Sequence, residues 1–352
     1  MRYYSLHITD PKTGQSIVPN PSGGFTRGTG PTFSSLAKLP FTGQVVPDPG
    51  ALNIELDVPV SQLAKPQGAA RLKIWGVGLQ MLGQASQLAG MNVQLSAGMS
   101  AGLPLANAAQ AGVILRGVVF QGYGNWEGSN QTLDLIVNPG PPGTTSSIFN
   151  RPVSFSWPAG SSLADAINAA LQATLPEFKR QVFISPHLTL PNDEAGYYAN
   201  PNQWADYLLG LTQPLGAQLL GFNYPGVSIV ASGDTVYVFD GTASGTIVTS
   251  LAFQDLIGQP TWISGTQIQF NTVLRADIGV GNKVKFPSGI LAPYALTSPA
   301  AAVPGNALPV NSKIAFQGTF VVNEVHHFGN FRDSAGDSWV TAFKATSTQA
   351  PT

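Results

Sequence analysis

Cysteine is absent from this chain of 352 residues. Its absence excludes disulfide bonds, thiol nucleophiles and thiolate metal sites. Charge is also scarce, because Asp, Glu, Lys and Arg make up only 10% of the chain, against about 25% in an ordinary soluble domain. The formal net charge is −1, so the chain as a whole offers no electrostatic attraction to nucleic acid. So little charge indicates a surface that is covered, either by lipid or by other protein.

Long hydrophobic runs are missing too. No segment reaches the roughly 18 apolar residues of a membrane-spanning helix, and apolar stretches such as ALNIELDVPV at 51–60 are interrupted by charge, Gly or Pro. The beginning, MRYYSLHITDPK, lacks the basic and then apolar layout of a signal peptide. We therefore expect no membrane insertion. A protein embedded in an assembly is the better interpretation, since interfaces are depleted in Lys, Glu and Asp, and residues 76–115 contain no charged side chain.

Glycine and proline, by contrast, are abundant, with 39 and 28 residues scattered between short apolar runs. This pattern is typical of many short strands and turns. Residues 52–58 alternate strictly between apolar and polar side chains, which predicts a half-buried strand. Residues 112–137 predict two strands around a turn at Asn125–Asn130, and further strands are expected at Gln267–Thr272 and Lys283–Phe286. Both ends of the chain therefore predict β-structure.

The middle of the chain differs in charge and in pattern. Residues 151–260 carry eight acidic and three basic side chains. Ser162 is a suitable N-cap for a helix whose apolar residues recur at helical spacing and which ends before Pro176. A second short helix is expected within residues 202–216, ended by Pro214. Strand-like pieces surround these helices, so we predict a small α+β module.

The chain therefore divides into two β-domains that flank an α+β insert. The expected limits are 1–140 for the first β-domain, 141–262 for the insert, 263–346 for the second β-domain and 347–352 for a flexible tail. Two hairpins indicate that the β-domains are related. Residues 120–137, with Trp126, and residues 325–345, with Trp339, share a strand, a polar turn that contains glycine and an aromatic residue, and a second strand.

Two of the four histidines, His326 and His327, stand side by side in the second hairpin. Adjacent residues of a strand point to opposite faces, so the two rings cannot hold one metal ion unless a bulge redirects one of them. Glu324 and His326 fall on one face, where a hydrogen bond or ion pair is expected, but a third metal ligand is missing. We predict structural or interface roles for both histidines, and no catalytic, cofactor or metal site.

A candidate site of another class is formed by Tyr197, Tyr198 and Trp204. Aromatic faces stack on sugars, and the adjacent Asp193 and Glu194 are of the residue type that glycosidases use. A carbohydrate-binding or carbohydrate-cleaving protein therefore stays open, against the plainer interpretation of core and turn aromatics. The sequence contains no zinc-protease, serine-hydrolase or P-loop motif, and we predict that the protein is not an enzyme.

The last hairpin carries the most informative pattern, which consists of a glycine, spaced valines, a histidine two residues before a second glycine, and a tryptophan. The matching positions are Gly318, Val322, Val325, His327, Gly329 and Trp339. This pattern resembles the second tube-like domain of bacteriophage tail baseplate central hub proteins, a family related to the hub part of type VI secretion spike proteins. The hairpin around Trp126 resembles the family's first tube-like domain. We therefore take these seven residues and His326 as candidate structural or interface residues.

The resemblance implies a fold that is mainly β with a smaller α+β insert, in which two tube-like β-barrel domains related by pseudo-symmetry flank the insert. It also implies a structural virion protein. Three copies would form a homotrimer with a pseudo-sixfold ring of β-domains. That ring would adapt the sixfold tail tube to the threefold central spike and would leave a lumen through which DNA passes during ejection.

The resemblance further implies partners and a location. The expected partners are the tail tube protein and a separate central spike protein, with tape-measure and baseplate wedge proteins as further candidates. DNA is expected only in transit. The expected location is the tail baseplate of the virion, assembled in the cytoplasm of the host bacterium. The alternative within the same class is a hexameric distal tail or tube-initiator protein, which would have one tube-like domain per chain.

Overall fold

The structure is a computed structural model of the whole chain. It describes residues 1–64, 69–99, 110–143, 150–220, 224–242, 248–264, 267–287, 316 and 318–347. The tail predicted at 347–352 lies outside the described residues, apart from Ser347.

One sheet of 15 strands dominates the molecule. Its main path runs, from one side to the other, through β18 (Thr261–Trp262), β19 (Gln267–Val273), β22 (Trp339–Ser347), β21 (Thr319–Asn330), β7 (Asn53–Val60), β8 (Ala70–Trp75), β11 (Asn130–Pro139), β10 (Gly112–Glu127), β9 (Asn92–Met99), β1 (Arg2–Thr9), β2 (Ser16–Pro19) and β3 (Phe25–Gly28). Off this path, β17 (Val248–Ser250) pairs with β20 (Lys283–Lys285), β20 pairs with β21, and β4 (Phe33–Ser34) pairs with β1. We call β1 to β11 the first β-region and β17 to β22 the second β-region.

Smaller elements complete the first β-region. The hairpin of β5 (Leu36–Lys38) and β6 (Val45–Pro47) forms a separate two-stranded sheet, and α1 (Leu79–Gly83) and the short 3₁₀ helix η1 (Ala85–Leu88) lie beside β10 and β11. Strand alternation explains the sheet. In β7, Ile54, Leu56 and Val58 are buried, while Asp57 between them is exposed, which confirms the strand predicted for residues 52–58.

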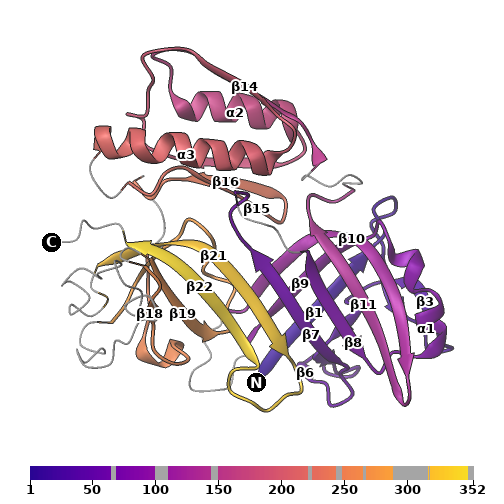
Figure 1. Ribbon diagram of the computed structural model, residues 1–352. Helices are drawn as coiled ribbons and strands as arrows, with labels where there is room; N and C mark the ends of the chain where they lie inside the picture. Colours follow the sequence, from indigo (N-terminus) through magenta and orange to yellow (C-terminus); the bar gives the residue numbers. More distant parts are fainter. Residues whose placement is uncertain are drawn as a thin grey trace.

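The insert between the β-regions is an α+β unit with its own buried apolar cluster. Its elements are β12 (Val153–Trp157), α2 (Leu163–Thr174), β13 (Lys179–Phe183), β14 (Glu194–Tyr198), α3 (Pro201–Leu220), β15 (Ser228–Ser232) and β16 (Thr235–Phe239). In Figure 1 the hairpin of β15 and β16 lies next to the large sheet, and α2 and α3 lie farther from it. The structure thus confirms a mainly β fold with a smaller α+β insert.

The insert is attached to the large sheet by backbone and side-chain bonds. The backbone N–H of Leu63 donates to Ile229 at 2.8 Å, and the buried Gln62 side chain donates to the hydroxyl of Ser228 at 2.9 Å. The buried Val230 belongs to the apolar cluster of the second β-region. Strands of that region begin before residue 263, because β17 and β18 pair with β20 and β19. The domain limits at 140 and 262 stay predictions.

Neither β-region closes into a barrel among the described residues. The edge of β7 pairs with β21 instead of with a strand at the other end of its own region. The two β-regions therefore share one continuous sheet (Figure 1). A strand edge leaves unpaired N–H and C=O groups, and β21 supplies partners for those of β7. The expected barrels are thus parts of an open sheet that continues from one region to the next.

Two helix predictions have different outcomes. Helix α2 begins after Ser162, as predicted, although the Ser162 side chain makes no capping bond. Helix α3 does not end at Pro214 but continues to Leu220. An internal proline costs about 3 kcal/mol, and packing beyond it offsets this cost. Gly216 is buried so closely against Tyr224 that a Cβ at this position would lie 2.0 Å from the tyrosine ring.

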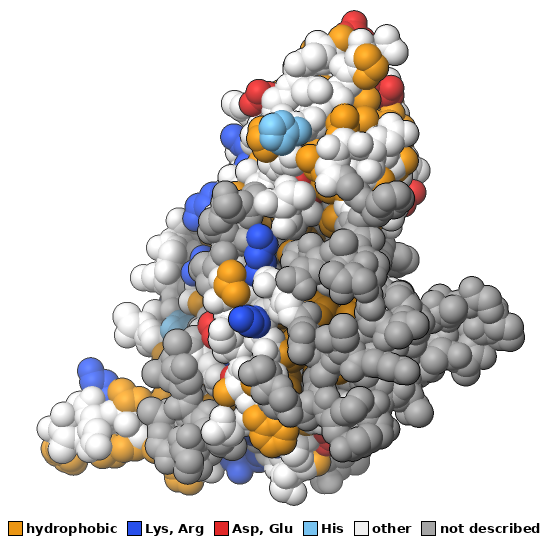
Figure 2. Space-filling view, turned by 90° about the vertical axis from the view of Figure 1, so that its left-hand side faces the viewer, with side chains coloured by type: hydrophobic (Ala, Val, Ile, Leu, Met, Phe, Trp, Pro, Cys, Tyr) orange, Lys and Arg blue, Asp and Glu red, His pale blue; other side chains and the backbone are white. Residues whose placement is uncertain are grey.

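The described surface is poor in charge, as the composition implies. On the face drawn in Figure 2, Lys, Arg, Asp and Glu side chains are few and lie scattered among uncharged ones. Within the described part of the chain, no helix combines the length and the apolar character needed to cross a bilayer.

Candidate functional site: the junction between the β-regions

The junction is the antiparallel ladder between β7 and the second half of β21. Its register runs from Val325 opposite Val60 to Asn330 opposite Glu55. Side chains reinforce the ladder, because His326 Nε2 lies 2.5 Å from Asp57 Oδ1 and the Asn330 amide donates to Glu55 at 3.2 Å. The hairpin singled out by the sequence therefore joins the two β-regions.

The two histidines of the junction differ in their surroundings. The His326 side chain is 46% exposed, whereas His327 is buried, with Nδ1 2.9 Å from the hydroxyl of Thr341. This confirms that the rings lie on opposite faces of the strand. Burial, and secondarily the neighbouring His326, lowers the pKa of His327 to about 3, so its ring is neutral near pH 7. The described residues contain no group of three His, Asp or Glu side chains that could hold a metal ion.

A bulge in β21 changes the predicted pairing of Glu324. The register shifts between Val322 and Glu324, so Val322 and Val325 are both buried, although strict alternation would separate them. Glu324 makes an ion pair with Lys344 at 2.7 Å. The expected Glu324–His326 pair is therefore replaced by two separate pairs, of Glu324 with Lys344 and of His326 with Asp57.

The end of this hairpin is fixed by Gly329 and Trp339. A Cβ at Gly329 would lie 2.4 Å from Cε3 of Trp339, so the ring requires glycine there. Trp339 is 2% exposed, and its indole N–H donates to the backbone oxygen of Gly98 in β9 at 2.9 Å. From the other side, Arg2 donates to the backbone oxygen of Asn330 at 2.8 Å. Residues of the first β-region therefore hold the turn of the second.

The other candidate interface residues occupy different positions. Gly318 has φ +101, a backbone conformation that favours glycine, directly before β21. Trp126 lies near the tip of β10, is 64% exposed, and donates from its indole N–H to Gly128 at 2.8 Å. It therefore lies on the molecular surface, while its predicted relative Trp339 is buried.

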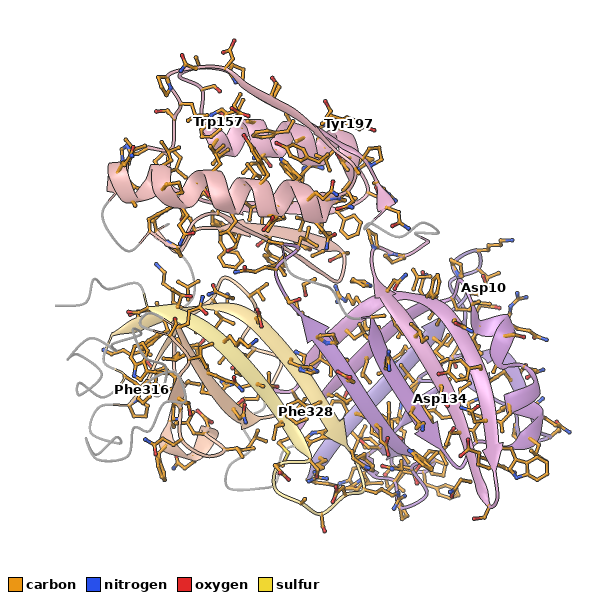
Figure 3. The ribbon with its side chains drawn as sticks, in the orientation of Figure 1. Asp10, Asp134, Trp157, Tyr197, Phe316 and Phe328 are labelled. Atoms are coloured by element: carbon orange, nitrogen blue, oxygen red, sulfur yellow. The ribbon has the colours of Figure 1, made fainter. Side chains whose placement is uncertain are left out.

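The structure does not bring the candidate glycan contacts together on one surface. Trp204 is fully buried in the insert and packs on Phe155, with 5.7 Å between the rings. A ring without an exposed face cannot stack on a sugar, so Trp204 is excluded as a glycan contact. Tyr198 packs on Tyr207 at 5.2 Å. Tyr197 is 75% exposed and lies beside the helices of the insert (Figure 3).

The nearby carboxylates also have structural partners. Asp193 Oδ1 accepts a bond from the backbone of Ala159 at 2.8 Å, and Glu194 accepts one from the hydroxyl of Tyr207. These contacts hold the β14 end of the insert in place.

One feature of the junction has no counterpart in the sequence predictions. The polar face of β7, β8, β11 and β21 forms a depression of about 680 Å³. Its lining includes Asp57, Arg71, Lys73, Asp134 and Phe328, of which the last two are labelled on β11 and β21 in Figure 3. The alternating polar residues of each strand are visible in the sequence. Their assembly depends on the pairing of β7 with β21, which no local pattern reveals.

Acidification is expected to destabilise the fold through His327. Because its folded pKa of about 3 lies below the ordinary value of about 6.5, the unfolded chain binds the proton and the folded chain does not. The contribution of the neutral His327 ring to the free energy of unfolding is therefore fully present above pH 6.5, and it is lost as the pH falls toward 3. The expected loss from His327 is about 2 kcal/mol between pH 7.5 and pH 5. Denaturant unfolding at both values measures it.

The control for this prediction is His327→Gln, which cannot titrate. The decrease in its free energy of unfolding between pH 7.5 and pH 5 should be smaller than that of the parent by about 2 kcal/mol. Equal dependences in the parent and in His327→Gln would contradict the assignment.

Comparisons with known proteins give structural similarity only. No family model matches the chain, and no curated protein matches its sequence. The chain is similar to the tail protein from Neisseria meningitidis MC58, with 8% identity, coverage of 99% of this chain and 97% of that one, and a TM-score of 0.46. It is also similar to the 43 kDa tail protein of prophage MuSo2 from Shewanella oneidensis, with 9% identity, 87% and 94% coverage, and a TM-score of 0.45.

A third similar structure is the lidded PdpA–VgrG complex of Francisella, with 7% identity, coverage of 100% of this chain and 54% of that one, and a TM-score of 0.37. All three scores lie below 0.5.

Proposed function

We propose that this protein is a structural component of a phage-type tail, and that three copies form the central baseplate hub between a sixfold tail tube and a threefold spike. The observation that carries this proposal is a repeat of five strands. In space, β7 to β11 are ordered β7-β8-β11-β10-β9, and β18 to β22 are ordered β18-β19-β22-β21-β20. The two sets have the same chain order and the same neighbours.

Irregularities within the strands strengthen the repeat. The first strand of each hairpin has a register shift, between Val119 and Gln121 in β10 and between Val322 and Glu324 in β21. Bulges are specific local features of a strand, so their occurrence at the same place in both sets supports a common unit. One chain therefore carries two similar units, and three chains carry six.

The repeat explains how one protein could match two symmetries. A homotrimer has threefold symmetry, which suits a threefold spike, while six similar units suit a sixfold tube. The units are already joined edge to edge within the chain by the junction. The low charge and the small net negative charge of the chain suit both close packing between copies and a lumen that DNA crosses without binding.

The proposed partners follow from this arrangement: the tail tube protein on one side and a central spike protein on the other, with tape-measure and wedge proteins as further candidates. The proposed location is the tail baseplate. A hexameric tube-initiator protein would need only one unit per chain, and the two units here argue against it. A carbohydrate-active protein is disfavoured by the buried Trp204.

The mass of the assembled protein in solution tests the proposal. We expect light scattering after gel filtration to give three times the chain mass of 36.8 kDa, because three chains close a ring of six units. A mass of six chains would support the tube-initiator alternative instead. A monomer at every concentration would contradict both structural proposals.

A further inference from the structure

A polar cleft of about 330 Å³ lies between the first β-region and the insert. Its floor is the outer face of β1, β9 and β10, and one wall is the turn of the β15 and β16 hairpin, which lies next to the large sheet in Figure 1. Ligand sites commonly measure about 300–1,000 Å³, so the cleft suits a small ligand. Its polar side chains are those of His7, Thr9, Asn92, Gln94, Arg116 and Asp234.

Strand register places three of these side chains in one row. His7 pairs with Gln94 across β1 and β9, and Gln94 pairs with Arg116 across β9 and β10. Thr9 and Asn92 form the next pair along the strands. Opposed residues of an antiparallel pair share a face and lie about 5 Å apart. The residues that alternate with them are buried in the first β-region, so all five side chains face outward into the cleft.

The stem of Arg116 is held against the insert. Gly233, in the turn between β15 and β16, has φ +57, and a Cβ at this position would lie 3.2 Å from Cβ of Arg116. Glycine therefore allows the turn to approach the arginine stem closely. A side chain that is already positioned loses less conformational freedom when its end group binds a ligand.

The cleft offers more free donors than free acceptors. The Arg116 guanidinium and the side chains of Gln94 and Thr9 make no hydrogen bond or ion pair with the described residues. The Asn92 side-chain oxygen accepts the backbone N–H of Gly143 at 2.9 Å, which leaves its NH₂ group without a partner. A guanidinium with five N–H groups and two amide NH₂ groups therefore stand ready for a ligand that is rich in acceptors.

The carboxylate of Asp234 does not compensate the charge of Arg116. Its Oδ2 lies 2.7 Å from Nζ of Lys179, and its Oδ1 accepts the hydroxyl of Thr235 at 3.0 Å. The bond from Lys179 holds the pKa of Asp234 below its usual range, and the charge of Arg116 acts in the same direction. Lys179 thus matches the charge of Asp234, and the positive charge of Arg116 is left for a ligand.

We infer that this cleft binds a small oxyanion, a carboxylate or phosphate group, with the Arg116 guanidinium as its main partner. The planar guanidinium forms two parallel bonds to a group of this kind. Gln94, directly opposite Arg116, and Asn92, two residues before Gln94, donate to the remaining oxygens. His7 bounds the site at the other end of the row. This inference goes beyond the proposed hub and does not depend on the number of copies.

The ligand would connect two parts of the molecule. Arg116 belongs to the first β-region, whereas Asp234 and its partner Lys179 belong to the insert. A bound oxyanion is therefore expected to hold the insert against the sheet, in addition to the bonds at Gln62 and Leu63. Because such a ligand binds the folded chain, it should also raise the melting temperature by mass action.

Isothermal titration calorimetry on the full chain tests the inference, with inorganic phosphate and acetate as separate probes at pH 7.5. Sodium chloride keeps the ionic strength constant. We expect saturable binding at one site per chain. Arg116→Gln should weaken it at least about tenfold, because the change removes the charged group that makes the strongest bonds. In chloride alone, this variant should keep the parent's melting temperature, since Arg116 is exposed and makes no bond to the described residues.

Asp234→Asn should have the opposite effect. The change removes the negative charge beside the site and releases Lys179 from its ion pair, so both probes should bind several-fold more tightly. A role of these residues in structure alone would not produce a gain in one variant and a loss in the other.

Two variants make the same changes of charge away from the cleft. Arg71→Gln removes an arginine of β8 that lies opposite Asp57. Asp206→Asn removes an exposed carboxylate of α3, a helix that lies farther from the sheet (Figure 1). Both variants should bind phosphate and acetate as the parent does.

The outcomes decide the inference without involving the trimer. Binding of one probe but not of the other supports the oxyanion site and identifies its group as phosphate or carboxylate. Absence of saturable binding of both probes overturns the site, as do equal affinities in the parent and in Arg116→Gln. A loss of the same size in Arg71→Gln overturns it too, because the anions would then respond to net charge. The mass of the assembled protein tests the hub separately.

Discussion

Replacing Trp339 with alanine is expected to lower the free energy of unfolding by about 3–5 kcal/mol. The side chain is 2% exposed, and it belongs to the apolar cluster of the first β-region although it lies on a strand of the second. Its indole N–H bonds Gly98, and its ring contacts Phe331 edge-on at 6.2 Å. Truncation removes this packing and leaves the oxygen of Gly98 without its partner.

The loss should be global because Trp339 connects several parts of the sheet. Its ring lies against Gly329 in β21, next to the ladder with β7, and its N–H reaches β9. Denaturant unfolding measures the effect as a lower midpoint, with the slope of the free energy against denaturant unchanged if the transition stays cooperative.

Trp126→Ala is the matched control, since Trp126 occupies the related hairpin and is 64% exposed. Its truncation should change the stability of the single chain by less than about 0.5 kcal/mol, as is usual for surface positions. Equal losses of stability in the two variants would contradict the different roles assigned to these tryptophans.

The period of two was sufficient to predict the local geometry of the junction. Alternation placed Asp57 on the polar face of its strand and separated His326 from His327, and the structure agrees on each point. Alternation did not predict the bulge after Val322. An extra residue in a strand reverses which face each later side chain occupies, and the sequence gives no local sign of it. The pairing of Glu324 with Lys344 depends on that bulge.

Long-range pairing could not be predicted from local patterns. The junction joins residues 55–60 to residues 325–330, and nothing in either segment identifies the other as its partner. The resemblance between the hairpins did indicate a repeat, whose full extent of five strands becomes visible only when the spatial order is known. For Trp204, aromatic chemistry suggested a sugar contact, whereas helix packing buries the ring.

Removing the buried Arg275 is expected to cost about 3–5 kcal/mol, because it would leave carboxylates without their cation. Arg275 is 3% exposed. Its guanidinium binds Asp277 through two bonds of 2.7 and 2.6 Å, and it lies 3.5 Å from Asp255. The Gln110 side chain donates to Asp255 at 3.0 Å.

This network is a second place where the β-regions meet, away from the β7 and β21 ladder. The backbone oxygen of Gln110, just before β10, accepts a bond from Ala276 at 2.7 Å. The network therefore fixes the start of β10.

Two variants distinguish the effect of losing the charge of Arg275 from the effect of losing the geometry of its guanidinium group. Arg275→Met should show the full loss, and Arg275→Lys should recover only part of it, because an ammonium group keeps the charge but cannot form the two parallel bonds to Asp277. Adding Asp277→Asn to Arg275→Met should restore stability by removing an uncompensated carboxylate. If that double variant is no more stable than Arg275→Met, the loss arises from packing of the arginine stem, and the charge network contributes little.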